Sequence, residues 1–166
     1  MSYSIVFSSQ TGNTKLLAET IHKTLPQENC VFFGFPDPEA LRADRLYVGF
    51  WTDKGTCDEA TGTFLETLRD KEVFLFGTAG FGGSPAYFEK ILASVQTHLD
   101  SSNTVIGTFM CQGKMPVSVR KRYEAMLNGP APAVNLKAMI ENFDQALSHP
   151  SEQDLHALGM KVWDLK

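Results

Sequence analysis

The chain has 166 residues, of which 43% are apolar and 20% are charged, and its formal net charge is −4. This length and apolar content can bury one substantial core, so we expect a single domain that spans residues 1–166. No basic stripe offsets the acidic balance, which argues against a nucleic-acid-binding protein.

The sparse cysteines and histidines argue against a disulfide scaffold or a metal centre. Cys30, Cys57 and Cys111 are widely spaced, lack a Cys-x-x-Cys pair and are expected to be free thiols. The four histidines are equally scattered, so no metal site is expected. No apolar run is long enough for a membrane span, and no signal peptide precedes the first predicted strand, so we expect a cytoplasmic protein.

Strands and helices are predicted to alternate along most of the chain. Short apolar runs predict buried strands at residues 3–7, 30–35, 45–50, 73–77 and 105–109. Helical spacing of apolar residues and helix-start signals predict helices at 15–25, 38–43, 56–68, 85–99, 117–127, 136–147 and from Ser151 onward. A loop is expected at 128–133, where glycine, prolines and alanines follow one another.

Several predicted helices have recognisable starts. Asp37 before Pro38, and Ser84 before Pro85, have the form of an N-cap followed by proline at the first helical position. Thr56 and Glu59 have the spacing of a capping box. The residues expected to face the core from the helices that follow are Thr61, Phe64, Leu65, Leu68, then Phe88, Ile91, Leu92, Val95, Leu99, and finally Leu136, Met139, Ile140, Phe143 and Leu147.

This alternation indicates an α/β fold, a doubly wound parallel sheet in three layers with helices on both faces. Ligands of such sheets bind at the carboxyl ends of the strands, where the strand order reverses. The strand order itself cannot be read from the sequence.

The first strand-to-helix turn, residues 8–14, has the composition of a phosphate-binding loop. A helix N-terminus offers free N–H groups and the positive end of the helix dipole. Ser9, Thr11, Asn13 and Thr14 add side-chain donors, and Gly12 lets the backbone approach closely. The Gly-Lys-Ser/Thr of a nucleoside-triphosphate P-loop is absent, so a phosphate other than a triphosphate is expected, with an ordinary helix cap as the alternative.

The pattern Ser-x-Thr-Gly-x-Thr at residues 9–14, directly after the first strand, resembles the FMN-phosphate loop of flavodoxins. The resemblance covers about the first 113 residues and implies a five-stranded sheet of order 2-1-3-4-5. It brings the loops after the first, third and fourth strands together at one edge. The FMN-binding residues it implies are Ser9, Gln10, Thr11, Gly12, Asn13, Thr14, Trp51, Thr52, Asp53, Lys54, Gly55, Thr78, Ala79, Gly80, Phe81, Gly82 and Gly83.

Individual roles also follow from the resemblance. Trp51 matches the aromatic that covers one flavin face, and Phe81 is the candidate for the other, the alternatives being that Trp51 covers the sheet end and Phe81 packs in the core. The Lys54–Gly55 peptide is expected to rotate toward the flavin N5 and stabilise a semiquinone, the alternative being a plain turn. Amides of the Gly80–Gly83 loop are expected to bind the pyrimidine edge.

The implied function is an FMN-containing electron carrier, a monomer without catalytic residues of its own that shuttles electrons between a flavoprotein reductase or other donor and an acceptor oxidoreductase. The alternatives are an NAD(P)H-dependent FMN or quinone reductase on the same fold and a cofactor-free receiver domain. A receiver would need acidic residues where Ser8 and Ser9 stand.

One segment lies outside this comparison. Residues 114–133 exceed a minimal flavodoxin and are expected to form an insertion or extra helix. The cations from Lys114 to Arg122 form either a docking surface or a solvated helix face. Cys57 and Cys111 are expected to be packing residues, with redox thiols as the alternative.

Overall fold

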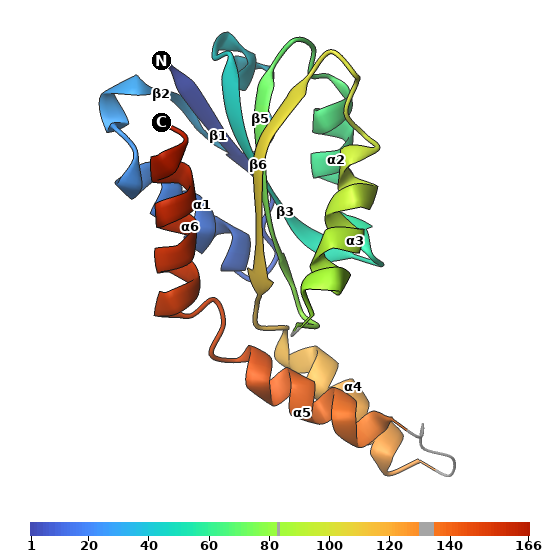
Figure 1. Cartoon of the computed structure of the whole chain (residues 1–166). Coiled ribbons are helices and arrows are strands. Elements are labelled where there is room, and N and C mark those ends of the chain that lie inside the picture. The colour runs from blue at the N-terminus through green and yellow to red at the C-terminus, as the bar shows by residue number, and fades with distance from the viewer. Residues whose placement is uncertain (83, 130–134) are drawn as a thin grey trace.

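The fold is a parallel sheet between two layers of helices (Figure 1), seen in a computed structural model that describes residues 1–82, 84–129 and 135–166. Gly83 and most of the loop expected at 128–133 lie outside the described residues. The strands are β1 (Tyr3–Phe7), β2 (Cys30–Gly34), β3 (Arg45–Asp53), β4 (Thr56–Cys57), β5 (Glu72–Ala79) and β6 (Thr104–Gln112). The α-helices are α1 (Asn13–Thr24), α2 (Glu59–Glu66), α3 (Pro85–Gln96), α4 (Val117–Leu127), α5 (Leu136–Ala146) and α6 (Glu152–Asp164).

The sheet has the predicted topology. Its main path runs β2-β1-β3-β5-β6, and every neighbouring pair on this path is parallel. Counting these five strands along the chain gives the order 2-1-3-4-5, which is therefore confirmed. The two-residue strand β4 lies off the path and pairs antiparallel with the end of β3.

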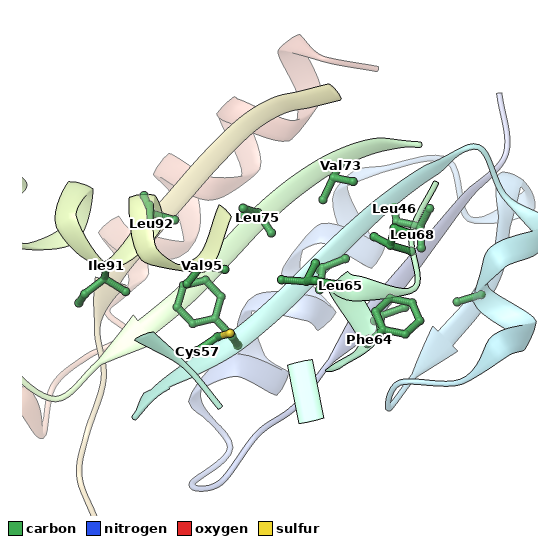
Figure 2. Packing of buried hydrophobic residues seen from close by; sticks show 14 of the residues in the cluster. Leu46, Cys57, Phe64, Leu65, Leu68, Val73, Leu75, Ile91, Leu92 and Val95 are labelled. Atoms are coloured by element: carbon green, nitrogen blue, oxygen red, sulfur yellow. The ribbon is translucent and has the colours of Figure 1, made fainter. Parts of the chain in front are cut away.

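Alternating side chains of the strands form one core on each face of the sheet. On one face Ile5, Tyr47 and Phe74 pack with α1 and α6 through residues such as Leu17 and Leu158. On the other face the strands pack with α2 and α3. Figure 2 shows this second core, with Leu46, Val73 and Leu75 from the strands, Phe64, Leu65 and Leu68 from α2 and its C-terminal end, and Ile91, Leu92 and Val95 from α3.

Two phenylalanine–glycine pairs fix the contact between the central strands β3 and β5. In the parallel register Gly49 is opposite Phe76, and Phe50 is opposite Gly77. A Cβ at either glycine would lie 2.3 Å from the ring of its partner. Both rings are fully buried, so each fills space that only a glycine across the strand leaves open.

The element predictions differ from the structure in several places. The predicted capping box of Thr56 and Glu59 is wrong: α2 begins at Glu59 and its N-cap is Asp58, whose carboxylate accepts from the Thr61 amide at 3.1 Å, while Thr56 belongs to β4. The short helix after Asp37 is a 3₁₀ helix, Pro38–Arg42. Helix α1 begins at Asn13, earlier than predicted. Leu147 is 52% exposed because α5 ends at Ala146, so its predicted burial is wrong.

Helices α4 and α5 form a hairpin that extends from the carboxyl ends of the strands instead of covering the sheet (Figure 1). Their contact buries Tyr123, Leu136 and Phe143 in a cluster separate from the two sheet cores. Within the described ranges, no helix has the length and apolar character needed to cross a bilayer.

Candidate functional site

The carboxyl ends of β1, β3 and β5 surround a small cavity at the edge where the resemblance places FMN. Its volume is about 70 Å³. Residues predicted to bind the cofactor that line it are Gln10, Thr11, Asn13, Thr14, Trp51, Thr52, Thr78, Ala79 and Gly80. The remaining lining comes from residues 113–116, the segment that follows β6. We call this segment the strap.

The backbone of the first loop turns sharply into α1. Gly12 has φ 89°, a left-handed conformation that favours glycine, and α1 begins at the next residue. The Ser9 hydroxyl accepts from the amides of Gly12 at 3.1 Å and Lys15 at 3.4 Å. Ser9 and Gly12 shape the loop in this way, although neither lines the cavity.

Two of the predicted phosphate donors are held by the strap. The Thr11 hydroxyl and the Asn13 amide donate to the Lys114 carbonyl at 3.3 and 2.8 Å. A Cβ at Gly113 would lie 2.5 Å from the Asn13 amide nitrogen, so the strap needs glycine at this contact. The sequence prediction missed the strap. Its one visible signal is the glycine directly after the last strand.

The Thr14 hydroxyl has a different environment from that of Thr11. Thr14 is buried, and its hydroxyl donates to the Phe50 carbonyl at 3.2 Å and lies 3.4 Å from the Thr78 hydroxyl. These contacts connect the first loop with the ends of β3 and β5. Thr14 therefore supports the loop as well as lining the cavity.

The end of β3 contributes an aromatic ring and an unpaired hydroxyl. Trp51 is half-buried, and its amide donates to Asp58, the carboxylate that caps α2, at 3.3 Å. Thr52 also lines the cavity. Among the described residues its buried hydroxyl has no hydrogen-bond partner, which costs about 1–3 kcal/mol for a group of this kind.

Lys54 and Gly55 form a tight hairpin turn between β3 and β4. Both have positive φ, 53° and 84°, as in a type I′ turn. Rotating the peptide between them would give a type II′ turn, which places Lys54 in a conformation that favours glycine. The turn geometry therefore argues against the expected peptide rotation. Asp53, Lys54 and Gly55 are exposed and do not line the cavity.

The loop after β5 is fixed by polar contacts from two directions. The Gly80 carbonyl accepts from the Gln112 and Asn142 amides, both at 3.0 Å. A Cβ at Gly80 would meet Met115 of the strap at 2.6 Å, and one at Gly82 would meet Gln112 at 2.7 Å. Phe81 is 43% exposed, so the alternative in which it packs in the core is wrong.

Both cysteines near the site lack the features of a reactive thiol. Burial, together with the nearby charge of Asp58, raises the pKa of Cys57 to about 11. Burial also raises the pKa of Cys111, well above its usual value. Since the thiolate is the reactive form, the geometry favours packing roles for both residues.

Comparison with known proteins gives one family over nearly the whole chain. The family model described as flavodoxin domain matches residues 4–162. A flavodoxin-like domain-containing protein BilS from Clostridium symbiosum (strain WAL-14163) is 38% identical over 174 residues, covering 95% of this chain and 92% of that protein. BilS from Clostridioides difficile (strain CD3) is 30% identical over 163 residues, covering 94% and 91%.

Solved structures agree on the fold. An archaeal flavodoxin has a TM-score of 0.53 at 17% identity, covering 99% of this chain and 96% of its own. A flavoprotein from Lactobacillus acidophilus NCFM, solved in complex with FMN, has a TM-score of 0.50 at 16% identity, covering 66% of this chain and 92% of its own. At these identities the likeness concerns the fold alone.

Proposed function

The chain belongs to the flavodoxin domain family, and from this premise we propose that it binds one FMN at the carboxyl edge of the sheet and carries single electrons between redox proteins. The first loop would hold the phosphate, and the ends of β3 and β5 would hold the remainder of the cofactor. FMN would supply the redox chemistry, and the residues of the chain would bind, orient and shield it.

The observation that carries this proposal is the unpaired Thr52 hydroxyl in a cavity that the N-terminus of α1 also lines. Buried hydroxyls in folded proteins are almost always hydrogen-bonded. A hydroxyl-bearing ligand with a terminal phosphate would satisfy Thr52 at one end and the helix N-terminus at the other. FMN has both groups.

The cavity is smaller than a site for FMN would need to be, so binding would require the site to open. Sites for ligands of this size usually have several hundred Å³, against about 70 Å³ here. The strap fills part of the edge, and its Lys114 carbonyl occupies the donors of Thr11 and Asn13. We infer that binding moves the strap, so that a phosphate takes over these donors from the Lys114 carbonyl.

Thr52→Val tests the proposal because it should have opposite effects on the two states of the protein. Removing an unpaired buried hydroxyl should raise the free energy of unfolding of the FMN-free protein by about 1 kcal/mol. The same change should weaken FMN binding by about fivefold through the loss of one hydrogen bond. Denaturant unfolding and flavin-fluorescence titration measure the two quantities.

Thr56→Val is the matched control. The Thr56 hydroxyl is also buried and unpaired among the described residues, but Thr56 does not line the cavity. Its replacement should stabilise the FMN-free protein similarly and leave FMN affinity unchanged. Equal FMN affinity for the two variants would show that Thr52 does not contact the cofactor.

A further inference from the structure

The hairpin of α4 and α5, which we call the arm, is a projection with its own core. Tyr123, Leu136 and Phe143 are at most 4% exposed within it. Arg120 of α4 makes two hydrogen bonds to the Asp144 carboxylate of α5, at 3.0 and 3.2 Å, and also pairs with Glu124. A self-supporting projection of this kind exposes most of its outer surface.

The base of the arm forms part of the candidate site. Asn142 of α5 donates to the Gly80 carbonyl, and its side-chain oxygen accepts from the Gln112 amide at 3.1 Å. The strap leads directly into α4, and its Lys114 carbonyl contacts the first loop. A protein bound to the arm would therefore lie beside the cavity.

The arm and the strap together have the opposite charge from the rest of the chain. Residues 113–147 contain five Lys or Arg against three Asp or Glu, a net charge of +2, whereas the whole chain carries −4. Arg120 is neutralised by Glu124 and Asp144. In the part of the chain that the structure describes, the other arm and strap cations are exposed and outside any ion pair: Lys114, Lys121, Arg122 and Lys137.

Apolar side chains accompany these charges on the outer surface. Val117 is 62% exposed, Met126 42% and Leu127 40%, all on α4. The arm's aromatic residues, Tyr123 and Phe143, are buried and cannot stack on nucleic-acid bases. In the described part of the arm, Tyr123, Leu136 and Phe143 face the hairpin core, and the large apolar side chains that stay exposed on α4 share its surface with basic residues, unlike the continuous apolar face that binds a membrane surface. Mixed apolar and basic surface suits a protein partner.

We propose that the arm docks an acidic surface of a redox partner and places that partner beside the cofactor site. This inference rests on the proposed function, since the partner would exchange electrons with bound FMN. Opposite charges on the two surfaces accelerate their encounter, and exposed apolar residues on α4 contribute contact area once the surfaces meet.

A charge-reversal variant tests the arm directly. FMN-loaded protein is reduced with dithionite and mixed with a strongly acidic blue-copper protein, each Cu(II) taking one electron from the reduced flavin to become Cu(I). Lys121→Glu with Arg122→Glu should lower the second-order rate by about tenfold at low ionic strength. Near 1 M salt, where the Debye length is about 3 Å, the rates should converge.

A second double variant controls for net charge. Lys23→Glu with Lys166→Glu makes the same change of charge at two exposed residues, one in the last turn of α1 and one at the C-terminus, which lies at the end of the sheet opposite α4 and α5 (Figure 1). This variant should stay within about twofold of the unmodified protein, since the steering charges are local. Lys121→Gln with Arg122→Gln removes the two positive charges without adding negative ones and should give an intermediate loss of rate. This variant keeps the test conclusive if the charge-reversed variant misfolds.

The failures of the two proposals can be separated. Protein that takes up no FMN would overturn the proposed function and the inference with it. Normal FMN binding, with equal rates of copper reduction for the arm variant and the control variant, would overturn the proposed docking role of the arm but not the proposed function. A third outcome is that the unmodified protein binds duplex DNA or phosphatidylcholine–phosphatidylserine vesicles tightly. If the arm variant lost this binding while its rate of copper reduction stayed unchanged, the partner of the arm would be a nucleic acid or a membrane, and the docking proposal would be wrong.

Discussion

Replacing Thr11 and Thr14 together by alanine should weaken FMN binding by about 10²–10³-fold. Each hydroxyl that a phosphate loses costs about 1–3 kcal/mol, and each 1.4 kcal/mol is a factor of ten. Riboflavin lacks the phosphate, so its affinity should fall by less than about tenfold. Both residues line the cavity at the start of α1. Quenching of flavin fluorescence on titration measures both dissociation constants.

Serine substitutions separate phosphate binding from loop support. Thr14 also donates to the Phe50 carbonyl, so its alanine variant disturbs the loop as well as the ligand. Thr11→Ser with Thr14→Ser keeps both hydroxyls and should retain FMN affinity within about threefold. Equal losses for FMN and riboflavin in the alanine variant would contradict a phosphate at this loop.

Gly77→Ala should lower the free energy of unfolding by about 2–3 kcal/mol, a typical cost of overpacking a core. The added methyl group would lie 2.3 Å from the buried Phe50 ring, which cannot leave its place between β3, β5 and the helices of that face. Urea unfolding followed by circular dichroism measures the change.

Two comparisons make this expectation specific. Gly34→Ala, whose new Cβ would have ordinary contact at 3.4 Å with Phe32, should change stability by about 0.5 kcal/mol or less. Phe50→Leu should recover part of the loss in the Gly77→Ala background, since the smaller side chain makes room for the methyl group. Additive effects of the two changes would show that Phe50 and Gly77 do not share this space.

The sheet and its helices could be predicted because buried apolar residues recur with the period of each strand or helix in the sequence. Strands such as β5, buried on both faces, are continuous apolar runs, and the helices over them repeat apolar residues at helical spacing. The strand order cannot be read from such periodicity and came from the resemblance to flavodoxins, which rests on the loops after the first, third and fourth strands together. The structure confirms this order.

The strap and the pairing of β3 with β4 could not be predicted, because they depend on contacts that leave no periodic pattern in the sequence. The Lys114 carbonyl meets Thr11 and Asn13, roughly a hundred residues earlier in the chain. The role of Gly55 depends on the positive φ that it shares with Lys54, which only the pairing of β3 with β4 reveals. The capping error at Thr56 has a simpler cause: Asp58, two residues later, is a better N-cap residue than threonine.

The rate at which NADPH alone reduces the FMN-loaded protein tests the proposed carrier function most directly. Trp51 lies at the cavity beside the position expected for the cofactor, where it would hinder a nicotinamide from stacking on the ring. We therefore expect NADPH to bleach the flavin absorbance only slowly, and a separate flavoprotein reductase to restore fast reduction. Rapid oxidation of NADPH by the protein and a quinone, with no reductase present, would contradict a carrier and identify an NADPH-dependent reductase instead.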